Sequence, residues 1–84
     1  MSGVREAIDV LARALTDRPG DVQVTESQHQ GRTLVELYVA PEDAGKVIGR
    51  QGRTAAALRT LAAIAGEREG LTVTLEIRDT PLKK

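Results

Sequence analysis

Two glycines spaced three residues apart, Gly49 and Gly52, interrupt a stretch of sequence that otherwise favours helix. Pro41 opens a short helix that is expected to run to about Ile48, and a longer helix is expected from about Arg53 to Ala65, ending near Gly66. Glycines at this spacing permit a sharp turn with no side chain over its crest. The chain is therefore constrained to bring two helices together at one narrow turn.

The segments on either side of this helical pair alternate between helix and strand patterns. Four aliphatic residues repeat at helical spacing near the N-terminus: Val4, Ile8, Leu11 and Leu15. Pro19 and Gly20 end that helix, because both residues extend a helix poorly. Alternating apolar residues then predict strands from residue 22, from 34 to 39 and from 71 to 77. We expect a turn at 28–31 and a frayed basic tail at about 80–84.

The predicted order is helix, strand, strand, helix, helix, strand. The first two strands are joined by a short turn and should pair antiparallel. The strand at 33–40 and the strand at 71–77 are separated by two helices, so they are expected to pair in parallel through a right-handed crossover. The simplest arrangement is an α+β fold in which three helices cover one face of a three-stranded mixed sheet.

Composition limits the kinds of protein this chain can be. Its 84 residues are enough for one domain, and they include no cysteine, one histidine and a single aromatic residue, Tyr38. We therefore expect no disulfide, no metal site and no reader built from rows of stacked rings. No apolar run is long enough to span a bilayer, and the N-terminus lacks the layout of a signal peptide. These features predict a cytoplasmic protein with no membrane partner.

Positive charge is concentrated around the turn, although the formal net charge of the chain is zero. No Asp or Glu occurs between residues 44 and 66, whereas four basic residues lie there: Lys46, Arg50, Arg53 and Arg59. A local basic surface suits contact with phosphate, even though zero net charge argues mildly against nucleic acid as the partner. Helical geometry places Arg59 away from the turn, and we expect it to be an ordinary solvated residue.

The turn combines several features of a phosphate-backbone clamp. The paired glycines let a sugar-phosphate chain approach the main chain closely. The helix that follows directs its free N–H groups and the positive end of its dipole toward the same place. Glycines in a helix-helix turn are common, so the pattern alone is weak evidence. The surrounding basic residues and the preceding isoleucine give it weight.

The run VAPEDAGKVIGRQGRTAAALRTL, residues 39–61, resembles the signature region of the small bacterial KH-domain RNA-binding proteins. The element order resembles the type II KH fold, and the resemblance extends over nearly all of residues 1–84, which would form one such domain. It implies binding of single-stranded RNA, with an RNA chaperone or post-transcriptional role in the cytoplasm and no enzymatic activity or cofactor. It also implies a homodimer, or a heterodimer with a larger KH protein that carries a second nucleic-acid-binding domain.

The resemblance also assigns roles to residues around the turn. Gly49, Arg50, Gln51 and Gly52 would form the loop that grips the RNA backbone, and Lys46 and Arg53 would flank it. Val47 and Ile48 would support or line an apolar groove for the bases, and we expect Ile48 to lie mainly in the core. The complete predicted RNA-binding set is Lys46, Val47, Ile48, Gly49, Arg50, Gln51, Gly52 and Arg53.

The helix after the turn carries more apolar residues than contact with one sheet requires. Its alanines and aliphatics span roughly half of the circumference at about 100° per residue. We hypothesise that one edge, formed by Ala57, Leu61 and Ile64, is part of a dimer seam. The alternatives are a helix buried broadly in a small core, or a competing contact patch at Leu34 and Tyr38 on the outer sheet face.

Two other classes of function were weighed against RNA binding. The sequence opposes an enzyme, because Gly45-Lys46 is followed by Val47 rather than the Ser or Thr of a nucleotide-binding P-loop, and no dinucleotide fingerprint occurs. The second alternative is a protein-interaction module, a KH fold whose main task is dimerisation while a partner supplies most of the RNA binding. The wide apolar helix favours this alternative and the intact basic turn disfavours it.

Overall fold

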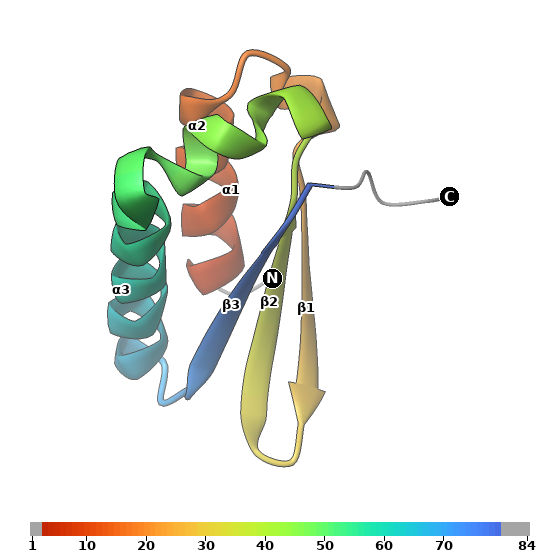
Figure 1. Cartoon of the computed structure of the whole chain (residues 1–84). Helices are drawn as coiled ribbons and strands as arrows, with labels where there is room; N and C mark the ends of the chain where they lie inside the picture. The colour runs from red at the N-terminus through yellow and green to blue at the C-terminus, as the bar shows by residue number, and fades with distance from the viewer. Residues whose placement is uncertain (1–2, 80–84) are drawn as a thin grey trace.

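The structure, a computed structural model, describes residues 3–79. Its helices and strands follow in the order α1 (Gly3–Leu15), β1 (Gln23–His29), β2 (Arg32–Tyr38), α2 (Ala44–Ile48), α3 (Arg53–Arg68) and β3 (Val73–Arg78) (Figure 1). Short 3₁₀ turns precede β1, α2 and α3, at Pro19–Asp21, Pro41–Asp43 and Arg50–Gly52. The tail predicted at 80–84 lies outside the described residues.

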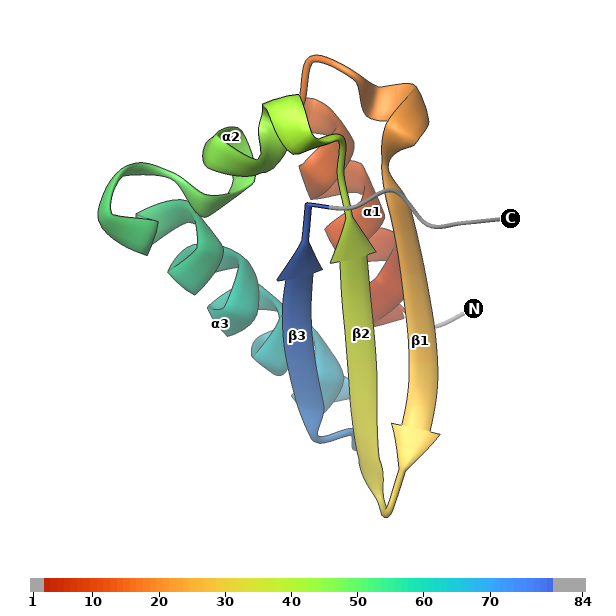
Figure 2. The ribbon, with the colours of Figure 1, turned by 45° about the vertical axis from the view of Figure 1, so that its right-hand side comes forward.

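The three strands form one mixed sheet in the order β1-β2-β3. Strand β2 pairs antiparallel with β1, from Gln23 opposite Tyr38 to His29 opposite Arg32, and in parallel with β3. Helices α1 and α3 lie behind one face of this sheet, and α2 lies at its upper end, while the other face is left open (Figure 2). The predicted α+β class and mixed sheet are confirmed.

The core lies between the sheet and the helices, as the spacing of apolar residues dictates. In α1 the inward positions recur every four residues, and in the strands they alternate. The buried cluster consists of Val4, Ile8, Ala12, Val22, Val24, Val35, Leu37, Val39, Val47, Leu58, Ala62 and Leu75. Removing these side chains from water is the main force that holds the three helices against the sheet.

The hairpin between β1 and β2 is tighter than the sequence indicated. Strand β1 continues to His29, so the predicted four-residue turn at 28–31 is wrong. The turn consists of Gln30 and Gly31 alone, with φ of 51° and 81°. Two successive positive φ values are typical of the two-residue turn whose twist matches that of the flanking strands. Ladder pairing can therefore extend to the last residue before the turn.

Helix α3 also ends later than predicted, because it continues through Gly66 to Arg68. Gly66 is an interior residue: a Cβ there would lie 2.5 Å from a methyl group of Val73 and 3.1 Å from the carbonyl oxygen of Leu71. Its missing side chain lets the helix approach β3 closely. The residue that ends the helix is Gly70, with φ of 72°, and the N–H of Leu71 donates to the Gly66 carbonyl over 2.8 Å.

Candidate nucleic-acid interface

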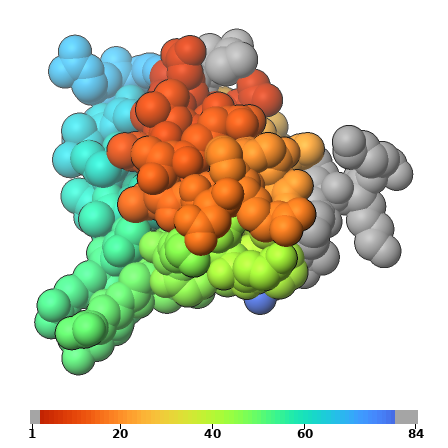
Figure 3. Space-filling view, turned by 90° about the horizontal axis from the view of Figure 1, so that it is seen from above, coloured from red at the N-terminus to blue at the C-terminus, as the bar shows by residue number. Residues whose placement is uncertain are grey.

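The turn between α2 and α3 is a strained four-residue loop. Gly49, Gln51 and Gly52 all have positive φ, at 77°, 57° and 72°. The Gly52 N–H donates to the Gly49 carbonyl over 3.1 Å and closes the turn. Figure 3 shows this segment, in green, projecting from the body of the molecule. The loop therefore offers its main chain to a ligand at the most prominent point of this face.

The two glycines are required for different reasons. A Cβ at Gly49 would meet the side chain of Thr54 and lie 3.0 Å from its backbone nitrogen, and the backbone there (φ 77°, ψ 172°) is one that only glycine adopts readily. A Cβ at Gly52 would have nothing within 4 Å, and its φ and ψ lie in the ordinary left-handed region. Gly49 is thus needed for packing, and Gly52 leaves open space beside the loop.

Two guanidinium groups are carried by this loop and by the first turn of α3. The Nη2 atom of Arg53 donates to the Oε1 atom of Gln51 over 2.9 Å, which ties the arginine to the crest of the loop. The side chain of Arg50 is exposed and makes no hydrogen bond or ion pair with any residue between 3 and 79, whereas its backbone carbonyl accepts the Arg53 N–H. No side chain in that range caps the N-terminus of α3. An exposed positive charge and a helix N-terminus without a side-chain cap therefore occur together in this part of the chain.

Lys46 is placed differently from the other predicted cations. Its ammonium nitrogen lies 3.2 Å from an Asp17 carboxylate oxygen and 3.8 Å from one of Asp43. The lysine is thus directed toward the segment after α1 rather than toward the loop crest. Its predicted contact with RNA stays a prediction, and it would require the side chain to leave these carboxylates.

The two apolar residues before the loop differ in burial, and Ile48 does not lie where it was predicted. Val47 is fully buried, so its side chain supports the loop from the core and has no surface for a base. Ile48 is 43% exposed, which contradicts its expected place in the core. A five-residue helix offers too few positions for periodicity to fix which side faces inward. Ile48 therefore provides an apolar surface directly beside Gly49.

Sequence reasoning missed the part that Asp43 plays in holding the loop. Its carboxylate is buried and accepts hydrogen bonds from the backbone N–H groups of Asp17, over 3.2 Å, and Arg18, over 3.0 Å. The Asp43 side chain does not cap α2, although it directly precedes that helix. Asp43 instead joins the segment after α1 to the start of the helix that leads into the loop. No local pattern signals a contact across about 25 residues of sequence.

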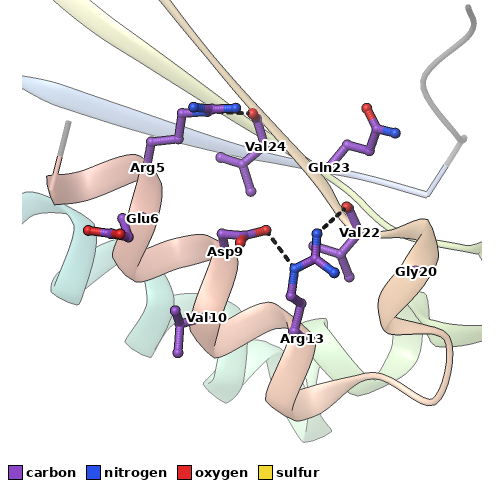
Figure 4. A pocket seen from close by; sticks show the side chains of 9 residues that line it. All are labelled: Arg5, Glu6, Asp9, Val10, Arg13, Gly20, Val22, Gln23 and Val24. Atoms are coloured by element: carbon purple, nitrogen blue, oxygen red, sulfur yellow. Dashed lines mark hydrogen bonds and ion pairs between the residues drawn. The ribbon is translucent and has the colours of Figure 1, made fainter. Parts of the chain in front are cut away.

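Arginines cover both free edges of the sheet. Arg59 donates from α3 to the Leu75 carbonyl of β3 over 3.3 Å, so it lies away from the loop as expected, although it is bonded rather than merely solvated. On the opposite edge, Arg5 and Arg13 extend from α1 to carbonyl oxygens of Val24 and Val22 (Figure 4). A cleft of about 410 Å³ lies between α1 and β1 there. Such contacts shield strand edges from pairing with other chains.

The predicted dimer-seam residues are all on the surface. Leu61 is 46% exposed and Ile64 is 51% exposed, and Ala57 beside them is exposed as well. The core-facing side of α3 is a separate face made of Ala55, Leu58, Ala62 and Gly66. The alternative of a helix buried all round is therefore wrong for this chain. Leu34 and Tyr38, the competing patch on the outer sheet face, are half-buried.

Other kinds of site find little support among residues 3–79. No group of three or more His, Asp or Glu side chains in that range is arranged to hold a metal ion. None of the helices there has the length and apolar character needed to cross a bilayer. The loop at 49–52 is thus the feature on which a functional assignment depends.

Comparison with known proteins gives a consistent result. The sequence model of the KhpA/KhpB KH domain matches residues 5–77. RNA-binding protein KhpA of Treponema pallidum is 50% identical over 74 residues, which cover 88% of this chain and 92% of the relative. RNA-binding protein KhpA of Mycobacterium tuberculosis is 47% identical over 78 residues, 92% of each chain. No matching solved structure was found. The chain therefore belongs to the KhpA/KhpB KH-domain family.

Proposed function

We propose that this chain is a single-stranded RNA-binding KH protein that holds the RNA backbone with the loop Gly49-Arg50-Gln51-Gly52. The observation that carries the proposal is the projecting loop itself, where a turn with positive φ leads into α3 beside an exposed guanidinium group that has no side-chain partner among residues 3–79. Related chains with the same family assignment are named RNA-binding proteins, and that family is not one of enzymes. Glycine-rich loops of this type clamp nucleotide backbones in KH domains.

Different residues around the loop contact different parts of the RNA. The open space at Gly52 admits a phosphate to the main chain, and the charges of Arg50 and Arg53 attract it. Ile48 would contact the apolar face of a neighbouring base, while Val47 fixes the helix behind it. With one aromatic residue in the chain and no ring beside the loop, base stacking contributes little.

A grip of this kind favours a general role over recognition of one target. Contacts to phosphate position an RNA but carry no sequence information. A small loop with few charges binds weakly and releases its ligand readily. We therefore propose an RNA chaperone or post-transcriptional function in the cytoplasm, performed by residues 1–84 as one type II KH domain.

Reversing the charge of the loop tests the proposal. Arg50→Asp/Gln51→Asp leaves both glycines in place and puts two carboxylates where a phosphate would lie. Fluorescence anisotropy with a labelled single-stranded RNA should show binding by the wild type that weakens with salt, and a loss of at least about tenfold in the variant.

The matched control for this experiment is Arg32→Asp/Gln30→Asp, which changes the same residue types at the hairpin tip. It should bind RNA with an affinity within about twofold of that of the wild type. The hairpin lies at the start of β2, whereas the chain enters α2 and the 49–52 loop after the end of β2. Circular dichroism establishes that each variant is folded. Equal RNA binding by the loop variant and the wild type would contradict the proposal.

A second surface favours self-association alongside RNA binding. The exposed face of α3 that carries Ala57, Leu61 and Ile64 is apolar, and small alanines allow close helix approach. We propose that it forms a homodimer seam, or a seam with a larger KH protein that carries a second nucleic-acid-binding domain. Two clamps in one dimer would add avidity. The intact basic loop disfavours the alternative in which a partner supplies most of the RNA binding.

Leu61→Lys should convert a wild-type dimer to a monomer, because a lysine at the centre of an apolar seam must be desolvated without a partner. Light scattering after size exclusion would show the mass in solution falling by half. Ala63→Lys, at an exposed position on the other side of the same helix, is the control and should leave the mass unchanged. A Leu61→Lys protein that keeps the mass of a wild-type dimer would exclude this seam.

A further inference from the structure

Lys46 is held by carboxylates at the point where the chain enters the loop. It lies three residues before Gly49, in the short helix α2, and its ammonium nitrogen is 3.2 Å from the Oδ2 atom of Asp17. Asp43 Oδ1 is the second carboxylate oxygen within reach, at 3.8 Å. In Figure 3 the segment after α1, in orange, lies directly against the yellow-green segment that begins α2.

The backbone beside Asp17 is fixed, although its side chain is in water. The Asp17 N–H donates to Asp43 over 3.2 Å, and the buried Asp43 carboxylate also binds the N–H of Arg18. The Asp17 side chain itself is 77% exposed. An ion pair at such a site is weak and opens readily. Asp17 is therefore held near Lys46 without being locked to it.

The neighbouring acids have a different partner. Arg18 is bound by Asp21 over 2.9 Å and by Glu42 over 3.4 Å. The hydrogen bond that Arg18 donates to Asp21 raises the pKa of the Arg18 guanidinium above its ordinary value, with smaller contributions from nearby carboxylates. Arg18 is thus engaged elsewhere, and Lys46 is the cation that faces Asp17. Removing the Asp17 charge would release Lys46 specifically.

We propose that Asp17 competes with RNA phosphate for Lys46 and so lowers the affinity of the loop for RNA. This inference rests on the proposed RNA-binding function. An RNA backbone that follows the loop from Gly52 past Arg50 would bring phosphate oxygens within reach of the Lys46 side chain, which lies one helical turn before Gly49. The lysine must leave Asp17 to reach them. The Asp17 carboxylate thus binds the Lys46 ammonium group when RNA is absent, which keeps RNA binding weak and RNA release fast.

A double-mutant cycle tests the proposal. Wild type, Asp17→Asn, Lys46→Ala and the double variant are titrated against a fluorescein-labelled oligouridine at two salt concentrations. Asp17→Asn should bind RNA roughly twofold to fivefold more tightly, the range that a surface ion pair allows. Its affinity should also fall more steeply with salt. The slope of log affinity against log salt concentration should increase by close to one, which corresponds to one additional released counterion. In the Lys46→Ala background the same substitution should have no effect.

Asp21→Asn is the control, because it removes the same charge from the same segment without facing Lys46. Arg18 keeps Glu42 in that variant, and RNA affinity should change by less than about 1.5-fold. Equal tightening by Asp17→Asn with and without Lys46 would reveal only a general charge effect and overturn the proposal. No tightening at all would overturn it as well. A complete lack of RNA binding by every protein, wild type included, would instead refute the proposed function.

Discussion

Gly49→Ala should lower the free energy of unfolding by about 2 to 3 kcal/mol and abolish RNA binding at the loop. Two causes combine at this position. The backbone at φ 77° and ψ 172° is costly for any residue with a Cβ, and the added methyl group would collide with Thr54 in the first turn of α3. Relief requires the loop to change shape or α3 to shift. Urea denaturation followed by circular dichroism measures the loss.

Gly52→Ala provides the matched comparison within the same motif. Its φ of 72° and ψ of 15° are in the left-handed region, and no atom lies within 4 Å of the added methyl group. The cost should be only about 1 kcal/mol. RNA binding should still weaken, because the methyl group would occupy the open space proposed for phosphate. Equal destabilisation by the two substitutions would contradict the described loop geometry.

Asp43→Ala should destabilise the fold by about 2 to 3 kcal/mol, because it removes the acceptor of two main-chain hydrogen bonds and leaves a cavity. The N–H groups of Asp17 and Arg18 would lose their partner, and the segment after α1 would no longer be joined to α2. Thermal unfolding would show the change as a clear fall in melting temperature.

Glu42→Ala is the control for Asp43, since the two acids are adjacent in sequence and differ in burial. The Glu42 side chain is exposed, and its one described ion pair, with Arg18, is long at 3.4 Å. Its removal should change stability by less than about 0.5 kcal/mol. A similar loss of stability in both variants would mean that net charge, and not the buried carboxylate, accounts for the effect.

The fold could be predicted from the sequence because several local signals agree. The four-residue apolar repeat of α1, the alternation in the strands and the glycine pair each allow few alternatives. The boundaries were less well specified. Gly66 was predicted to end α3, and only the approach of β3 shows that this glycine is instead needed inside the helix for packing. Turn length in the hairpin depended similarly on ladder pairing.

The site was predicted in outline and missed in detail. The glycines and Arg50 are adjacent in sequence, so their arrangement follows from a local motif. Lys46 and Asp43 both contact a segment more than 20 residues away, at Asp17 and Arg18, and such contacts depend on the packing of α1 against α2. Ile48 was wrongly expected in the core because one turn of helix leaves its inward side undetermined.

The most direct test of the proposed clamp is to locate the RNA on the protein. Uniformly ¹⁵N-labelled chain would be titrated with a single-stranded oligouridine while amide chemical shifts are recorded. We expect the largest changes at the backbone amides of Gly49 to Thr54, with smaller ones at Ile48. Changes confined to the open sheet face around Leu34 and Tyr38, or to the cleft between α1 and β1, with the loop amides unmoved, would contradict the proposed clamp.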